Sequence, residues 1–277
     1  MPPPQGHPWL VQPPRPRFAY GFTPLIREYR NALSGSAKAL MDFGILRQRA
    51  GERSGGLLAK ETVWVLLNGR AQITTSAGAV NVSRASLFDE APTTLHAGAG
   101  ERVEIKALTS DTEWAVVAAT NSKFKGVRLY APAEVENEDR GAGLAQEACR
   151  RTVRAIFDYA SQPASQLVVG EVVNRAGRWS SYPPHHHAQP EVYHYRFTAP
   201  QGYGHAELGE QVVKVRAGDT TLIPGGLDHA QVAAPGYGMY YLWIVRHLPR
   251  RPYKGFTFTR EHTWLLDPKN QGWQPPA

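Results

Sequence analysis

The feature that most constrains the fold is a succession of short β-type segments separated by turn residues. From about Glu61 onward, runs of β-branched and aromatic residues end in glycine, proline or asparagine. Glu101–Leu108 and Glu113–Asn121 alternate with the period of two that is typical of strands with one buried face. The 277 residues include 26 glycines and 22 prolines, which provide many turns for this length. This spacing favours a sandwich or barrel over an alternating βαβ sheet. We therefore predict an all-β chain.

Two such β-rich stretches follow one another. Residues 131–148 separate them; this segment is charged, contains two glycines and lacks strand periodicity, which is typical of a linker. At roughly 100–200 residues per domain, the chain has room for two domains. We predict an extended proline-rich arm over residues 1–20, an N-terminal domain over 21–140 and a C-terminal domain over 141–277.

Two local predictions concern the N-terminal half. Asn68-Gly69 is a hairpin signal between Thr62–Gly69 and Arg70–Ser76. A helix is expected only near Thr23–Met41, where the apolar spacing is irregular.

The charge and composition of the chain limit which binding partners and which cellular location we expect. Lys and Arg total 31 and Asp and Glu total 24, which gives a formal net charge of +7. No window concentrates these cations, so we expect no nucleic-acid partner, and the charge suits an anionic small molecule. The apolar run Met239–Val245 is too short to cross a bilayer, and the proline-rich start is unlike a secretory signal. Cys149 is the single cysteine and cannot form an internal disulfide. We expect a cytoplasmic protein without a membrane partner.

Three histidines and a carboxylate have the spacing of a metal site. His185 and His187 are two residues apart and so point to one face of a strand, and Glu191 shares their parity. His229 follows a turn shaped by glycines and a proline and begins the next strand segment. Three imidazoles and one carboxylate can bind a divalent ion such as Zn, Mn, Fe, Ni or Co. The sequence leaves the identity of the metal open.

These residues carry a resemblance to a known family. His185-x-His187-x3-Glu191, followed by Gly218-x5-Pro224-x-Gly226-x2-His229, resembles the two cupin motifs. Over roughly residues 20–267, phrases such as RWSSYPPHHH, GDTTLIPGGLDHAQVAAPGYGMYYLWI and SLFDEAPTTLHAGAGERVEI resemble the bacterial 5-deoxy-glucuronate isomerase family of myo-inositol catabolism. The 5-keto-4-deoxyuronate isomerases are related to that family. The loop 188–190 is shorter than is usual there, so the choice between 5-deoxy-glucuronate and a related uronate stays open.

The resemblance implies a fold and an activity. The expected fold is a bicupin of two jelly-roll-type β-barrels. The C-terminal cupin would bind the metal, and the N-terminal cupin, where nothing repeats the ligand pattern, would not. The implied reaction is a metal-dependent aldose–ketose isomerisation of a uronic-type sugar acid, from 5-deoxy-glucuronate to 2-deoxy-5-keto-gluconate.

Such a reaction needs a group that moves a proton and a cation that holds the substrate carboxylate. Residue type and strand position give three candidates for the proton-moving group: Glu171, Tyr193 and Tyr241. They give three candidates for the carboxylate partner: Arg196, Lys214 and Arg246.

Two other function classes stay open at this level. An Fe(II) cupin dioxygenase can use the same ligand set, and oxygen uptake would identify it. A non-catalytic sugar-binding cupin would bind a sugar and leave it unchanged. The oligomeric state is also open, since exposed β edges could pair in a homo-oligomer.

Overall fold

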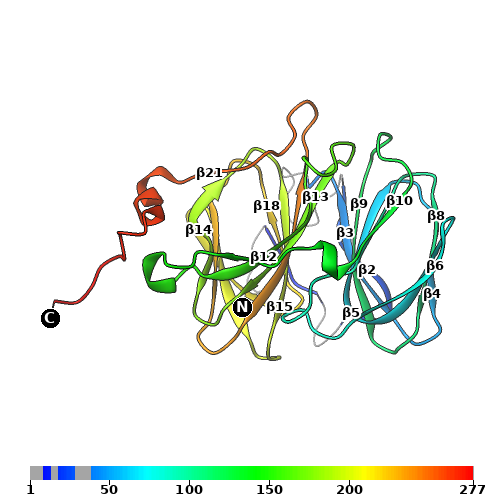
Figure 1. The fold of residues 1–277 in the computed structure, drawn as a ribbon, viewed down its shortest axis with the longest axis horizontal. Coiled ribbons are helices and arrows are strands. Elements are labelled where there is room, and N and C mark those ends of the chain that lie inside the picture. The colour runs from blue at the N-terminus through cyan, green and yellow to red at the C-terminus, as the bar shows by residue number, and fades with distance from the viewer. Residues whose placement is uncertain (1–8, 14–17, 29–38, 277) are drawn as a thin grey trace, which may run out of the picture. The chain divides into compact units, whose positions relative to one another are not determined.

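The computed structural model describes residues 9–13, 18–28 and 39–276, and most of these lie in strands (Figure 1). The helical elements among them are three 3-10 segments: η1 (Pro132–Glu134), η2 (Ala145–Glu147) and η3 (Arg260–Leu266). Within this described part, no helix is long and apolar enough to cross a membrane. The described residues are mostly β, in agreement with the predicted fold class.

The described chain divides into two compact units. The N-terminal unit contains the described residues of 13–136 together with 155–169. The C-terminal unit contains residues 9–12, 137–154 and 170–276.

The N-terminal unit is built on a nine-stranded sheet around one long strand. The order β10-β7-β5-β9-β3-β2 forms its main path, and β4, β6 and β8 extend it from β5. Its strands are β2 (Gly21–Ile26), β3 (Asp42–Gln48), β4 (Arg53–Leu57), β5 (Glu61–Thr75), β6 (Gly78–Arg84), β7 (Thr94–Ala97), β8 (Arg102–Ala107), β9 (Thr112–Ala119) and β10 (Val127–Tyr130). The first part of β5 pairs with β7 and β9, and its second part pairs with β6 and β8.

In this unit one local prediction was wrong, and another was wrong over the residues that the structure describes. Asn68-Gly69 makes no hairpin: both residues lie inside β5, where the register with β9 shifts. Gly69 has a φ of +97°, and a Cβ there would lie 2.6 Å from the Thr112 hydroxyl, so glycine serves a close approach inside the strand. Thr23 lies in β2 instead of a helix. Among the described strands, β2 pairs only with β3, and such an edge position tolerates Pro24. Residues 29–38 of the predicted helix lie outside the described residues.

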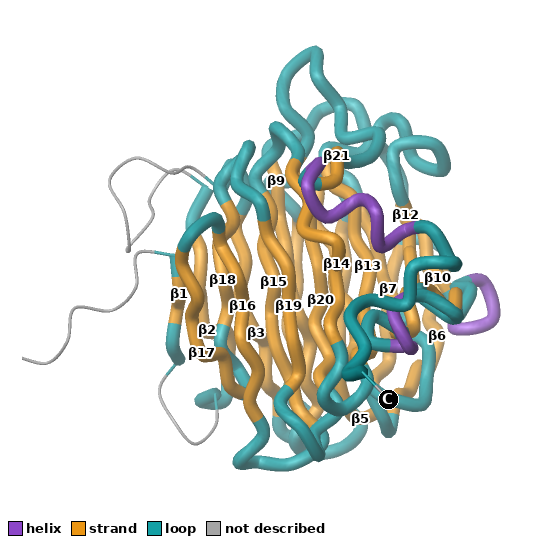
Figure 2. Tube along the Cα trace, turned by 90° about the vertical axis from the view of Figure 1, so that its left-hand side faces the viewer, coloured by secondary structure: helices purple, strands orange, loops and turns teal. Residues whose placement is uncertain are grey.

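The C-terminal unit contains two sheets whose side chains share one core. The seven-stranded sheet has the order β1-β18-β15-β20-β13-β12-β11, and the five-stranded sheet has the order β17-β16-β19-β14-β21. Its strands are β1 (Leu10–Val11), β11 (Glu138–Arg140), β12 (Arg151–Phe157), β13 (Leu167–Asn174), β14 (Trp179–His186), β15 (Glu191–Phe197), β16 (Tyr203–Leu208), β17 (Gln211–Arg216), β18 (Thr220–Ile223), β19 (His229–Ala233), β20 (Met239–Arg246) and β21 (Thr257–Phe258). Residues 155–157 of β12 and 167–169 of β13 are counted with the N-terminal unit. Figure 2 shows β16, β19 and β14 running side by side.

Strand alternation decides which side chains face this core. On β15 the odd-numbered Tyr193 and Tyr195 belong to the buried cluster, as Tyr241 does on β20. Val213 of β17 and Ala206 of β16 join them from the other sheet. Since successive side chains of a strand point to opposite faces, the even-numbered residues of β15 and β20 lie on the other side of their sheet.

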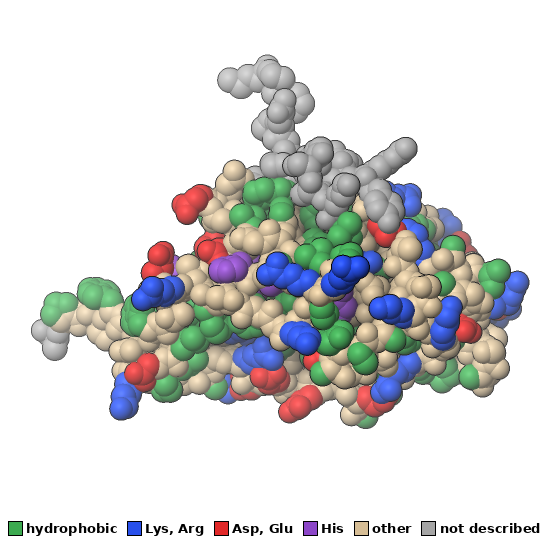
Figure 3. Space-filling model, turned by 90° about the horizontal axis from the view of Figure 1, so that it is seen from above, with side chains coloured by type: hydrophobic (Ala, Val, Ile, Leu, Met, Phe, Trp, Pro, Cys, Tyr) green, Lys and Arg blue, Asp and Glu red, His purple; other side chains and the backbone are tan. Residues whose placement is uncertain are grey.

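Positively charged side chains are spread over the face drawn in Figure 3. Figure 3 shows one face, on which Lys and Arg side chains are spread among acidic and uncharged ones. This distribution agrees with the absence of a concentrated basic tract in the sequence.

Candidate metal centre

Three strand ends bring the predicted ligands together. His185 lies near the end of β14 and is the register partner of His229, the first residue of β19. Glu191 is the first residue of β15. His185 and His187 are both buried, whereas His186 between them lies half-exposed, with its Nδ1 2.6 Å from Oδ1 of Asp228. The period-two spacing thus turns two of three successive imidazoles inward.

The short loop between His187 and Glu191 is interlocked with the turn that precedes His229. The backbone N–H of Gly226 donates to the carbonyl oxygen of His187 at 2.6 Å. A Cβ on Gly225 would lie 1.9 Å from the carbonyl oxygen of Ala188, so only glycine fits there. Backbone contact therefore fixes the distance between the two ligand-bearing segments.

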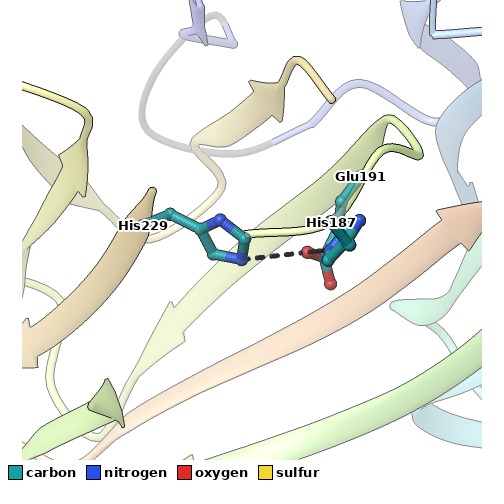
Figure 4. A group of neighbouring side chains, drawn as sticks. All are labelled: His187, Glu191 and His229. Carbon is teal, nitrogen blue, oxygen red and sulfur yellow. Dashed lines mark hydrogen bonds and ion pairs between the residues drawn. The ribbon is translucent and has the colours of Figure 1, made fainter. Parts of the chain in front are cut away.

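His187, Glu191 and His229 form a buried cluster with the dimensions of a metal site (Figure 4). Oε2 of Glu191 lies 3.0 Å from Nε2 of His187 and 3.2 Å from Nε2 of His229. One potential ligand atom from each residue lies within 4.8 Å of the other two. His185 lies beside the cluster, with its ring centroid 4.4 Å from that of His229.

The hydrogen bonding at His229 fits a metal ligand. The Nδ1–H of His229 donates to the carbonyl oxygen of Leu227 at 2.9 Å, so in the neutral ring that binds metals the lone pair is on Nε2. This Nε2 is buried and close to Glu191, but it makes no hydrogen bond of acceptable geometry. A buried nitrogen lone pair aimed at a carboxylate is costly unless a cation lies between them. The donor set therefore fits a divalent ion.

The environment also sets the protonation states that a metal requires. Burial raises the pKa of Glu191, but the imidazoles of His187 and His229 outweigh it and lower that pKa to about 2. Burial, together with the neighbouring His229, lowers the pKa of His185 to about 3. At neutral pH the carboxylate is ionised and His185 is neutral, and these are the forms that bind metals.

Two predicted tyrosines lie next to this cluster. The ring centroid of Tyr193 lies 5.9 Å from that of His229 and 4.7 Å from that of Tyr241. The Tyr241 hydroxyl lies 2.5 Å from Oγ of Ser180 and 3.3 Å from Oγ of Ser181. Burial raises the pKa of both tyrosines, so both keep their protons at neutral pH. They are therefore hydrogen-bond donors in the resting state.

The structure does not bring Glu171 to the cluster. Its carboxylate accepts a 2.6 Å hydrogen bond from the Tyr240 hydroxyl and lies 3.5 Å from Nη1 of Arg154. Tyr240 alternates with Tyr241 along β20, so Glu171 lies on the opposite face of the sheet from the histidines.

The three predicted cations make contacts outside the cluster. Arg196 contacts His194 and alternates with the core residue Tyr195 on β15. Lys214 is exposed, with its Nζ 3.9 Å from the centre of the Tyr203 ring. Arg246 donates to the carbonyl oxygen of His247 at 2.7 Å. Successive side chains of a strand point to opposite faces, so Arg196 on β15 and Arg246 on β20 point away from the side of the core-facing residues.

Sequence reasoning missed three aromatic residues that pack beside the histidines. The Tyr253 ring lies 4.9 Å from that of His187, and the Phe256 ring lies 4.2 Å from that of His185. Phe258 on β21 lies 6.4 Å from His185. They follow the last long strand and belong to no motif, so only the tertiary fold reveals them. Their rings limit water access and lower the local dielectric constant.

The chain is similar in sequence to a known protein family and to curated relatives. A model of the KduI/IolB family matches residues 28–265. A 5-deoxy-glucuronate isomerase of Geobacillus kaustophilus (strain HTA426) is 34% identical over 228 residues, which cover 76% of this chain and 79% of that relative. The enzyme of the same name from Geobacillus thermodenitrificans (strain NG80-2) is 33% identical over 238 residues, covering 78% and 84%.

The chain is also similar to solved structures. An IolB-like protein from Salmonella typhimurium LT2 has a TM-score of 0.73 and 26% identity, covering 82% of this chain and 90% of that chain. An oxalate decarboxylase from Lactobacillus farciminis has a TM-score of 0.64 at 14% identity, covering 90% and 87%, and this likeness concerns the fold alone.

Proposed function

The chain belongs to the KduI/IolB family, and from this premise we propose that it is a metal-dependent aldose–ketose isomerase of a uronic-type sugar acid. The substrate we propose is 5-deoxy-glucuronate, converted to 2-deoxy-5-keto-gluconate, because the curated relatives at 33% and 34% identity are 5-deoxy-glucuronate isomerases. The observation that carries the proposal is the buried cluster of His187, Glu191 and His229. The proposed architecture is a bicupin of two jelly-roll-type barrels, supported by two compact units of antiparallel strands.

Four residues would hold the metal. His187, Glu191 and His229 supply the buried cluster, and His185 completes the set from the adjacent strand end. A bound divalent ion supplies Lewis-acid stabilisation of negative charge on the substrate carbonyl and its neighbouring hydroxyl. Glu191 would offset part of the charge of the ion, and the aromatic rings beside the histidines would limit the access of bulk water. Zn, Mn, Fe, Ni and Co all suit such a ligand set.

The tyrosine hydroxyls supply the proton-handling groups of this proposal. Isomerisation moves one hydrogen from the hydroxyl-bearing carbon to the adjacent carbonyl carbon and one proton between the two oxygens. Tyr193 and Tyr241 are protonated at neutral pH, so they donate hydrogen bonds to substrate oxygens. Ser180 and Ser181 orient the Tyr241 hydroxyl.

Substitution of Tyr241 by phenylalanine tests this role. The ring and its packing stay, and only the hydroxyl is lost, so we expect kcat to fall ~10²–10⁴-fold, the range for a positioned proton donor. Steady-state kinetics and metal content measure the effect. The matched control is Tyr240→Phe, one residue away on the opposite face of β20. An unchanged kcat in Tyr241→Phe would remove the hydroxyl from the mechanism.

The reaction itself is tested with metal-loaded protein and 5-deoxy-glucuronate. We expect NMR to show the ketose accumulating without oxygen uptake. Oxygen consumption would indicate a dioxygenase instead, and a sugar that binds but stays unchanged would indicate a binding protein. Parallel reactions with other uronates establish whether the short loop 188–190 alters the choice of substrate.

A further inference from the structure

A sugar acid carries a carboxylate that the metal centre does not account for. In an acyclic uronic-type substrate this group lies at the opposite end of the carbon chain from the aldehyde. Its recognition therefore needs a cation on the core side of the C-terminal unit, some distance from the histidines. Arg196, Lys214 and Arg246 do not occupy that position.

Strand β12 places a different arginine on the core side. Val153 belongs to the buried cluster that also contains Tyr193 and Tyr241. Arg151 lies two residues before Val153 on the same strand, so both point to the same face. Arg151 is half-buried at the first residue of β12, where the core face of the sheet begins.

Arg151 differs from the arginines around it in its partners. Arg150 binds Asp139 and Glu147, Arg154 lies by Glu171, and Arg140 makes two hydrogen bonds to Glu138, of 2.6 and 2.8 Å. Arg151 instead donates through Nη1 to the carbonyl oxygen of Cys149 at 2.8 Å.

No ion pair joins Arg151 to a carboxylate of the described residues. Glu138 is close enough for Arg151 to help lower its pKa, but the Glu138 carboxylate is occupied by Arg140, the register partner of Arg151. A half-buried guanidinium without a carboxylate partner retains donors for an anionic ligand.

Arg151 is close enough to Tyr241 to influence the pKa of its hydroxyl. Burial raises the pKa of Tyr241, and Arg151 is the foremost opposing influence on it. Tyr241 packs on Tyr193, which in turn packs on His229. The core face therefore carries the proposed metal ligands, two tyrosine hydroxyls and the Arg151 guanidinium.

We propose that Arg151 binds the carboxylate of the substrate, an inference that rests on the proposed function. The guanidinium makes two parallel hydrogen bonds to the carboxylate while the aldehyde end lies at the histidines. Arg151 thereby selects sugar acids over neutral sugars.

Binding and turnover of a charged substrate and a neutral analogue test this assignment. The probes are 5-deoxy-glucuronate and its methyl ester, and the proteins are metal-loaded wild type, Arg151→Gln and Arg151→Lys. Kd is measured by calorimetry, and KM and kcat by NMR. We expect Arg151→Gln to weaken binding of the acid about 10- to 100-fold, since a charge-assisted hydrogen bond to a carboxylate is lost. The ester should bind wild type and Arg151→Gln alike, and Arg151→Lys should recover part of the loss.

The controls separate charge recognition from general damage. Lys214→Ala removes an exposed cation and should leave binding unchanged, and melting curves with metal content show that the Arg151 variants remain folded. Equal weakening of acid and ester, or no weakening of either, would overturn the assignment. Wild type that binds the acid without converting it would refute the proposed function, while the Kd values would still decide the role of Arg151. A wild type that binds neither probe would refute both.

Discussion

Replacement of His187 by alanine is expected to abolish metal binding and isomerisation, while replacement of its neighbour His186 leaves both intact. His187 is buried against Glu191, whereas His186 is half-exposed and contacts Asp228. Lewis-acid stabilisation is worth several kcal/mol, and about 1.4 kcal/mol corresponds to a tenfold change in rate. We therefore expect kcat/KM to fall ~10³-fold or more in His187→Ala.

The two variants form a matched pair because they remove the same side chain from adjacent positions. Metal content is measured by elemental analysis after reconstitution, and activity by NMR. His229→Ala should behave like His187→Ala, because Nε2 of His229 also faces Glu191. Equal metal content in the His186 and His187 variants would contradict the placement of the site.

Replacement of Glu61 by alanine is expected to cause the largest loss of stability in the N-terminal unit. Its carboxylate is fully buried and accepts four hydrogen bonds. The donors are Nε2 of His96 at 2.7 Å, Oγ of Ser165 at 2.6 Å, Nδ2 of Asn121 at 2.7 Å and the backbone N–H of Gln166 at 3.0 Å. Removing one member of a buried charged network costs about 3–5 kcal/mol. Urea unfolding measures the free energy of unfolding.

The control for this prediction is Glu134→Ala. Glu134 makes an exposed ion pair with Arg128 at 3.4 Å, and such pairs contribute only about 0–1 kcal/mol. Similar losses of stability in the two variants would show that the buried network contributes little.

The same network predicts a pH dependence. Burial raises the pKa of Glu61, but His96, Ser165 and the Gln166 backbone outweigh it, and the pKa is lowered overall. The ionised group therefore stabilises the fold at pH values above the ordinary glutamate pKa of about 4.3, and this contribution is lost as the pH falls through the lowered pKa. Acid should weaken wild type more steeply than Glu61→Ala.

The proximity of the proposed metal ligands could be predicted because it depends mainly on local strand geometry. Two imidazoles at i and i+2, a carboxylate of matching parity and a histidine after a glycine-shaped turn need only strand geometry to converge. His185 and His229 are indeed register partners on adjacent strands. The turn itself depends on Gly225, which no other residue could replace without a clash with Ala188.

The remaining site residues depend on packing that local patterns do not encode. Glu171 and Arg196 are candidates by residue type and by their position in a strand. In the structure, however, each faces the side of its sheet opposite the core. Arg151 belongs to no sequence motif. It keeps donors for a ligand because neighbouring arginines pair with the nearby carboxylates. Asn68-Gly69 is a strong local turn signal, yet pairing of β5 with strands on both sides keeps the chain extended there.

The most direct measurement is a metal titration of metal-free protein. Chelator-treated protein is mixed with 5-deoxy-glucuronate and increasing Mn, Zn, Fe(II), Ni or Co, and ketose formation is followed by NMR. The proposed site predicts no conversion without metal and, for at least one ion, a rate that rises to a plateau at about one ion per chain. Full activity in protein verified to be metal-free, or no conversion with the His187–Glu191–His229 cluster loaded, would contradict metal-dependent isomerisation at this site.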